Sequence, residues 1–345
     1  MSEFNAQALG LARQYRSFSQ KELAEKVNIQ QASLSKMEKG DLIPSTERVL
    51  ELSKALNVPI SFFQQTFIHA NAFSFHAYRK KSAVSKYAIE RVLAEISIKI
   101  NHLNQINDAE VSINNQFLGF TDYKALARSI REAFGLSNMP IVNLSKLVED
   151  LGITIIPCNF DTTQVDGLTS KINHEAPIIF MNMNQPPDRW RFSLAHELCH
   201  CLMHVEQMIS TPEMEKEANE FAAELLMPET ATNALVNRLQ TTNLGTFYEL
   251  KKQWKVSMAA LIYRAKTLGK ISDAQYTSLF KQMSMRGFRT QEPQPFEIEM
   301  PTKFYQLLKT YTDKSETQPN ELFHLNIDDF KSLYPNFYPQ GVSVT

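Results

Sequence analysis

The sequence predicts a mainly α-helical protein with one small β-sheet, an α+β fold made of two or three domains. Glycine supplies only 10 of the 345 residues, and helix-forming side chains are abundant along the whole chain. Three short segments rich in β-branched residues follow one another near the middle of the chain, at 153–158, 165–169 and 176–182. Such segments are typical of strands, and together they predict a three-stranded sheet.

The composition indicates an ordinary globular protein, with 43% hydrophobic and 21% charged residues. The formal net charge of −1 excludes a general attraction to nucleic acid, so any DNA contact has to be local. Cys158, Cys199 and Cys201 have neither disulfide nor zinc-site spacing, which favours a reducing, cytoplasmic compartment. We expect no membrane partner, because there is no signal-peptide pattern and no apolar run of roughly 18 residues.

Residues 1–66 are predicted to form five short helices separated by turns. Ser19 and Glu22 have the spacing of a capping box, which marks the start of a helix. Gly40 is suited to the left-handed conformation that ends a helix, and Ser45 is suited to cap the next one. Pro59 begins the last and shortest of the five.

This segment resembles the XRE (lambdoid-repressor-like) helix-turn-helix family over about residues 5–65. The residues that carry the resemblance are Ser19-Gln20-x-x-Leu23-Ala24, Ser35, Glu38-x-Gly40 and Pro44-Ser45-Thr46. The resemblance implies a five-helix domain that binds a double-stranded DNA operator. In such a domain the second helix of the motif enters the major groove.

By this resemblance, Gln31, Ala32, Ser33 and Lys36 would face base edges, since Gln can pair with adenine and Ala can touch the thymine methyl group. Gln20, at the start of the preceding helix, would bind a phosphate. Residues 1–66 contain eight basic and seven acidic side chains, a balance that predicts weak binding by a monomer and a need for dimerisation. The alternative is a helix-turn-helix domain that serves protein interaction only.

Residues 67–118 are interpreted as a linker and a long helix. Residues 78–81 and Lys86 form a local basic cluster, which either touches DNA beside the operator or is simply solvated. The helix carries an apolar seam over two heptads. The seam residues are Ile89, Leu93, Ile96, Ile100 and Leu103. This seam either joins two copies into a homodimer or packs against the following domain.

The strongest chemical motif is HELCH at residues 196–200, an HExxH pattern. Residues four apart share one face of a helix, so His196 and His200 can bind the same zinc ion. Glu197 can then take a proton from the attacking water. The alternative is a buried helix with two hydrogen-bonded histidines. His204 lines up with both, but eight residues of helix rise by about 12 Å, so it is expected to play a supporting or helix-end role.

The third ligand is expected on the helix that follows residue 210. Five glutamates lie on it, and helical periodicity groups four of them on one face: Glu213, Glu217, Glu220 and Glu224. The fifth, Glu215, falls beside the apolar stripe, and we therefore predict it as the inward carboxylate. It completes a His₂Glu site for one zinc ion per chain. Asn219, one turn further on, can accept the second N–H of a ligand histidine.

HELCH followed by Glu215-x-x-x-Asn219-x-Phe221-Ala222 resembles the ImmA/IrrE family of bacterial metallopeptidases, over about residues 120–270. Supporting residues are Asp166-Gly167, Val256-Ser257 and Tyr263-Arg264. The family is gluzincin-like, and its members cleave helix-turn-helix repressors of stress, mobile-element or phage-defence genes. The resemblance implies that His196, His200 and Glu215 bind zinc and that Glu197 is the general base. Cys199 departs mildly from the small residue usual at its position.

Tyr263 or Arg264 would either stabilise the oxyanion of the transition state or serve only in packing. The strand at 176–182 is expected at the edge of the sheet, where it would capture an extended peptide substrate by backbone hydrogen bonds. Residues 119–285 thus form the expected zinc peptidase domain. An aromatic and acidic region, 286–345, has no assigned role; it is either a partner-docking segment or packs back on the peptidase.

These interpretations predict a DNA-binding zinc metallo-endopeptidase of a bacterial regulatory switch, which cleaves a repressor-type partner protein. The alternative is a transcriptional regulator without proteolysis, whose peptidase-like domain senses a ligand or a metal. The presence of Glu197 favours the enzyme, because a pure sensor needs no general base.

Overall fold

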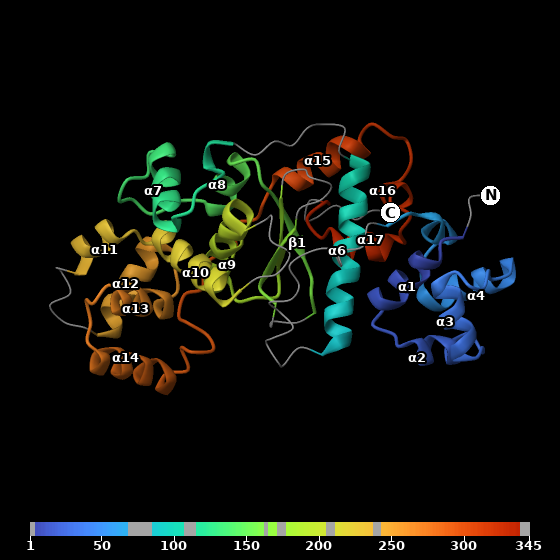
Figure 1. Cartoon of the computed structure of the whole chain (residues 1–345), viewed down its shortest axis with the longest axis horizontal. Coiled ribbons are helices and arrows are strands. Elements are labelled where there is room, and N and C mark those ends of the chain that lie inside the picture. The colour runs from blue at the N-terminus through green and yellow to red at the C-terminus, as the bar shows by residue number, and fades with distance from the viewer. Residues whose placement is uncertain are drawn as a thin grey trace. The chain divides into compact units, whose positions relative to one another are not determined.

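The computed structural model describes residues 4–67, 85–106, 115–161, 165–170, 177–204, 211–236 and 243–338. The predicted basic cluster at 78–81 lies outside these residues. The chain divides into two compact units (Figure 1). The first unit comprises Met1–Glu110, Pro157–Val165 and Thr302–Thr345, and the second comprises Val111–Ile156 and Asp166–Pro301. The mainly helical fold with a small sheet is confirmed.

The first unit begins with the five expected helices. They are α1 (Ala6–Tyr15), α2 (Gln20–Lys26), α3 (Gln31–Lys39), α4 (Thr46–Leu56) and the 3₁₀ turn η1 (Ile60–Gln64). The predicted boundary signals are confirmed: Ser19 and Glu22 form a capping box, and the Ser45 side chain accepts from the backbone N–H of Arg48. Gly40 ends α3 with a φ of 82°, a conformation that favours glycine.

Helix α6 (Lys86–Ile106) runs through the first unit and is enclosed by its own chain. Ile96, Ile100 and Leu103 of the predicted seam are all buried within the unit. Helix α1 packs on one side, where the Arg91 guanidinium lies 4.1 Å from the centre of the Tyr15 ring. The seam is therefore used for intramolecular packing, and these three side chains are not available to a second copy.

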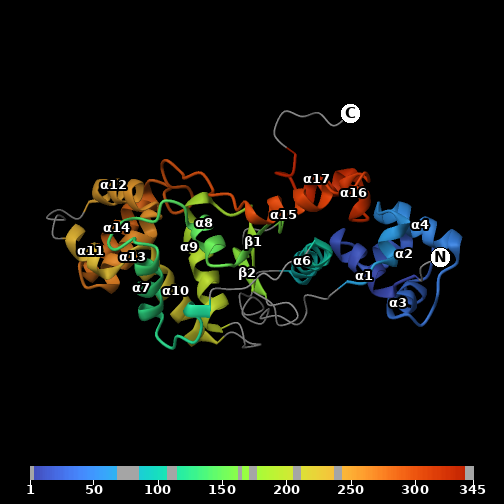
Figure 2. The ribbon, with the colours of Figure 1, turned by 90° about the horizontal axis from the view of Figure 1, so that it is seen from above.

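Helices α15 (Lys303–Thr312), α16 (Pro319–Leu322) and α17 (Ile327–Leu333) also belong to the first unit, beside α6 (Figure 2). Phe304, Phe323, Phe330 and Tyr334 form an aromatic cluster against α6. His102 of α6 is buried among them with its Nδ1 beside the Tyr334 hydroxyl, and burial lowers the pKa of His102 to about 3. The aromatic region thus packs within the first unit.

Polar contacts join this region directly to the helix-turn-helix. Arg16, at the end of α1, donates from Nη1 to Asp329 Oδ1 at 2.7 Å and pairs with the second carboxylate oxygen through Nη2. Asn326 donates to the backbone oxygen of Asn57, at the end of α4. We call these contacts the tail clasp. The clasp touches the ends of α1 and α4 and leaves the exposed side chains of α3 uncovered.

The sheet is made of β1 (Thr154–Cys158), β2 (Gly167–Ser170) and β3 (Ile178–Asn182), whose strand order is β1-β3-β2. Strands β2 and β3 belong to the second unit, in which β1 also begins, and the last two residues of β1 are counted with the first unit. Strands β2 and β3 are antiparallel, with Gly167 opposite Met181 and Ser170 opposite Ile178. The expectation that the strand at 176–182 lies at the edge is wrong, because its described part, β3, is central. The edge strand that packs on the HELCH helix is β2.

Helices account for most of the rest of the second unit. They are η3 (Asn115–Phe117), α7 (Tyr123–Ala133), α8 (Leu144–Asp150), α9 (Pro187–Cys199), the π-helical turn η4 (His200–His204), α10 (Pro212–Leu226), α11 (Glu229–Val236), α12 (Leu244–Trp254), α13 (Met258–Thr267) and α14 (Asp273–Met285). In the described part of the chain, none of the helices combines the length and apolarity needed to cross a membrane.

Helix α9 carries the HELCH motif and is surrounded by α8, α10, β2 and β3. Trp190, Leu194 and Leu198 are completely buried on it. Its first turn is fixed by charge: Asp188 accepts from Lys251 Nζ at 2.7 Å, and Arg191 pairs with Glu299. Residues 286–301 supply Glu299 and so fasten the start of this helix.

We expect Asp329→Ala to destabilise the first unit by about 1–3 kcal/mol, because the change leaves the half-buried Arg16 cation without its carboxylate. Hydrogen exchange of the α1 and α6 amides measures this, since both tryptophans, Trp190 and Trp254, lie in the second unit. The control is Asp313→Ala, whose ion pair with Lys309 is exposed and is expected to contribute less than about 0.5 kcal/mol. Equal effects of the two substitutions would contradict the clasp.

Candidate metal centre and DNA-reading helix

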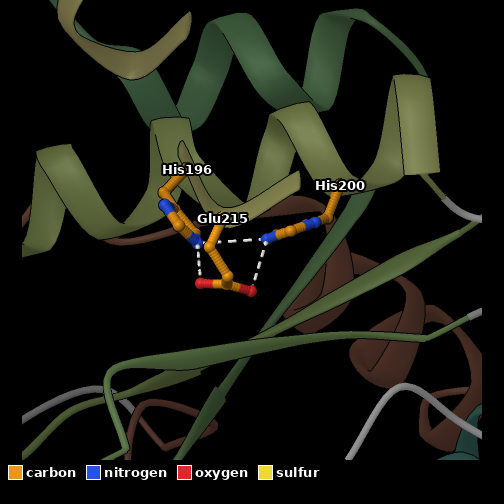
Figure 3. Close-up of side chains that lie close together, drawn as sticks. All are labelled: His196, His200 and Glu215. Atoms are coloured by element: carbon orange, nitrogen blue, oxygen red, sulfur yellow. Dashed lines mark hydrogen bonds and ion pairs between the residues drawn. The ribbon is translucent and has the colours of Figure 1, made fainter. Parts of the chain in front are cut away.

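Three side chains from two helices converge on one point (Figure 3). His196 and His200 project from the same face of α9 and its π-helical extension, and Glu215 reaches them from the first turn of α10. The two histidine Nε2 atoms are 3.1 Å apart. Glu215 Oε2 lies 3.5 Å from Nε2 of His196, and Glu215 Oε1 lies 3.5 Å from Nε2 of His200. The sequence-predicted ligands are therefore brought together.

These distances fit a tetrahedral zinc site. Zinc–ligand bonds of about 2.0–2.1 Å place tetrahedral ligand atoms about 3.3 Å apart. The two nitrogens are 3.1 Å apart, and each lies 3.5 Å from one of the two carboxylate oxygens, so the observed separations lie on either side of that value. Two imidazoles and a carboxylate are also a donor set that suits zinc and leaves one position open. The residues present fit the metal that the sequence predicts.

The second nitrogen of each ligand histidine has its own partner. His196 Nδ1 lies 3.1 Å from the Oδ1 of Asn219, the residue predicted to accept from one of the two histidines. His200 Nδ1 lies 3.0 Å from His204 Nδ1. His204 thus lies behind His200 and outside the group of three side chains that could hold a metal ion, as the helix-rise argument requires. Both imidazoles are oriented with Nε2 toward the centre.

Glu197 is buried beside the centre, in contact with β2. The Thr169 hydroxyl donates to Glu197 Oε2 at 2.8 Å. A Cβ on Gly167 would lie 3.0 Å from Glu197 Cγ and 2.9 Å from Met181 Sδ, so the strand approaches this closely only with glycine there. Burial raises the pKa of Glu197 above its ordinary value, against the lowering effects of His196 and Thr169.

The electrostatics of the two histidines differ. Burial and the neighbouring His196 lower the pKa of His200 to about 3, so its imidazole is neutral, the form that binds a metal. Burial also lowers the pKa of His196, but the Glu215 and Glu197 carboxylates outweigh burial and raise it. Of the two imidazoles, only that of His196, next to the carboxylates, is therefore favoured to take up a second proton.

The two oxyanion candidates lie in different surroundings. Arg264 is buried, pairs with Glu224 and donates from Nε to the Met227 carbonyl at 3.1 Å, contacts that correspond to packing. Tyr263 is 57% exposed. Glu224 is buried, although periodicity grouped it with three other glutamates away from the apolar stripe. The Arg264 cation explains why this carboxylate can be buried.

The predicted base-reading side chains share one exposed face. Gln31, Ala32 and Lys36 of α3 are exposed and Ser33 is half-buried. Gln20, predicted to bind phosphate, is the first residue of α2, and its Nε2 donates to Glu38 Oε2 at 2.8 Å. Glu38 in turn accepts two hydrogen bonds from the buried Arg13. Gln20 is therefore held at the helix N-terminus by the domain's internal ion pair.

Sequence reasoning did not single out Thr169 or assign a role to Glu217. Thr169 lies in a short strand with no signal for its partner. Glu217 Oε2 lies 3.0 Å from His204 Nε2, although its helical position placed it with the solvated glutamates. Only Glu217 had a sequence signal that could have identified it, because it lies between Glu215 and Asn219 on the same helix.

Comparison with known families gives two matches. A family model described as an IrrE N-terminal-like domain matches residues 148–266, and one described as helix-turn-helix matches residues 9–63. A search of curated proteins finds no match. Fold, site and matches together define a DNA-binding regulator that contains a peptidase-family domain. More narrowly, the chain joins an XRE-type helix-turn-helix domain to a metallopeptidase-type domain of the IrrE/ImmA family.

Glu215→Gln is expected to weaken zinc binding by about 10-fold or more, because an amide is a poorer zinc ligand than a carboxylate. Zinc content after gel filtration, measured by plasma mass spectrometry, should fall from about one ion per chain. Glu213→Gln is the matched control, because Glu213 lies on the same helix, is exposed and does not belong to the group of three side chains that could hold a metal ion. Loss of zinc from both variants would contradict the assignment.

Proposed function

We propose that this protein is a zinc-dependent endopeptidase of a regulatory switch, and that it cleaves a repressor-type protein while its helix-turn-helix unit binds an operator. The observation that carries the proposal is the buried Glu197 beside the His196, His200 and Glu215 group. A structural histidine pair needs no carboxylate of this kind. A zinc ion in the centre would polarise the substrate carbonyl and lower the pKa of water.

Glu197 is the proposed general base. It takes the proton from the water that attacks the peptide carbonyl and transfers it to the leaving amine. The Thr169 hydroxyl donates to Oε2 of this carboxylate and so fixes its orientation. The surrounding apolar residues of α9 and β2 exclude bulk water from the carboxylate.

Strand β2 is the proposed guide for the substrate. It is a terminal strand in the order β1-β3-β2, and Thr169 on it contacts Glu197. An extended segment of the repressor that adds to the sheet would gain backbone hydrogen bonds, and its side chains would determine the specificity. We therefore assign substrate binding to residues 167–170 and not to the strand at 176–182, where it was expected.

We expect Glu197→Gln to lower the cleavage rate at least about 100-fold, because it removes the proton acceptor and keeps the shape of the side chain. Purified protein with Zn²⁺ is incubated with repressors encoded beside it, and the products are identified by mass spectrometry. Zinc content is measured in parallel and should not change. If the wild type cuts neither these repressors nor itself, and the substitution has no effect in cells, the non-proteolytic regulator is the better description.

DNA recognition has a separate test. Gln31→Ala is expected to weaken binding to an operator selected from random DNA by about 1–3 kcal/mol, through the loss of base contacts. Lys36→Ala should also weaken it, with a smaller dependence on sequence. Lys54→Ala, which removes an equal charge from the end of α4, is the control. Titration by fluorescence anisotropy measures all three, and equal affinities would exclude α3 as the reading helix.

A further inference from the structure

His204 uses both of its ring nitrogens. Its Nδ1 lies 3.0 Å from Nδ1 of His200, and its Nε2 lies 3.0 Å from Oε2 of Glu217. The side chain is buried, and its ring centre is 5.0 Å from that of His200. The chain reaches this position by the π-helical turn η4, a geometry frequent at functional sites. His204 is thus fixed between a ligand histidine and a carboxylate.

The proton positions follow from these contacts. A metal bound through Nε2 of His200 would leave the remaining proton of this ring on Nδ1. That N–H donates to His204 Nδ1, which must therefore be the unprotonated nitrogen of its ring. The proton of His204 is then on Nε2 and is donated to Glu217, which can only accept. Each hydrogen bond determines the next one.

We propose that Glu217 and His204 are positioning residues that set the tautomer and orientation of His200, and thereby the metal affinity of the centre. The inference rests on the proposed function only in taking His200 as a metal ligand. Asn219 performs the corresponding role for His196 directly. Helix α10 therefore supplies one ligand, Glu215, and the outer support of both histidine ligands.

The side chain of Glu217 supports this role over that of a solvated surface charge. It is 42% exposed, yet the oxygen that reaches His204 serves a ring that is only 6% exposed. A carboxylate behind a ligand imidazole makes that ligand more basic, and loss of such partners typically weakens metal binding by about 10–100-fold. In this protein the carboxylate of Glu217 acts on His200 through one additional imidazole, that of His204.

The experiment compares zinc dissociation constants of the metal-free full chain, measured by competition with a chromophoric chelator. Glu217→Lys replaces the acceptor by a donor and should weaken zinc binding about 10–100-fold. Glu217→Gln keeps an acceptor oxygen and should stay near the wild type. Glu213→Lys makes the same charge change at an exposed position of α10 and is the matched control.

A second pair tests His204 itself. His204→Phe keeps the ring but cannot accept from His200, so its affinity should fall to the same extent. His204→Asn places an amide oxygen near the former Nδ1, as Asn219 does for His196, and should restore binding. Thermal unfolding of each metal-free variant establishes that it is folded. If a variant binds zinc more weakly but is still folded, the substitution has changed the orientation of His200 and not the fold.

Nitrogen-15 NMR of labelled histidine gives a readout that packing alone would not change. In the zinc-loaded wild type, His204 should carry its proton on Nε2 and His200 on Nδ1. Glu217→Lys should move the His204 proton to Nδ1. The proposal is overturned if His204 carries its proton on Nδ1 in the wild type, or if Glu217→Lys and Glu213→Lys bind zinc equally well.

The outcomes separate this inference from the proposed activity. A wild type that binds zinc and cuts no protein contradicts the proposed peptidase activity but not the positioning role of Glu217 and His204. If cleavage depends on Glu197 and Glu217→Lys binds zinc as tightly as the wild type, the peptidase activity is supported and the positioning role is contradicted. A wild type that binds no zinc overturns both.

Discussion

The packing of α9 against α10 is the constraint on which the second unit depends, because a metal centre of this kind needs ligand atoms from two helices within about 3.3 Å of one another. Small buried residues, Ala195 on α9 and Ala218 and Ala222 on α10, allow the two helices to approach closely. The start of α9 is held by Asp188 and Arg191, whose charged partners come from α12 and from residues 286–301. The apolar contacts bring the helices together, and the ion pairs fix α9 along its axis.

The same packing explains why so many polar groups can be buried beside the centre. Each one has a partner that is itself fixed: Glu197 has Thr169 of β2, and His196 has Asn219 of α10. Burying these groups without partners would cost several kcal/mol each, so the strand, the two helices and the polar chemistry have to form together. Gly167 is part of this arrangement, because a side chain there would push β2 away from the carboxylate that it supports.

Features with a local signal could be predicted from the sequence. The spacing of HELCH and the periodicity of the following glutamates identified His196, His200 and Glu215, and capping residues located the helix-turn-helix elements. Features that depend on distant segments could not be predicted. The heptad seam of α6 is a correct sign of burial, but a pattern of apolar residues does not name its partner. Local sequence also carries no information on strand order, so the expectation that residues 176–182 form an edge strand is wrong. The bond between Arg16 and Asp329 joins residues 313 positions apart, and neither side chain carries a sign of the other.

The tail clasp has a consequence for how the protein is made. The first unit is assembled from both ends of the described chain, with most of the peptidase sequence inserted between them. On the ribosome, the helix-turn-helix emerges early, but Asp329 and the aromatic cluster that pack on it emerge after the whole metal centre has been synthesised. A chain interrupted during synthesis would thus carry the helix-turn-helix without the C-terminal helices that pack on it in the first unit.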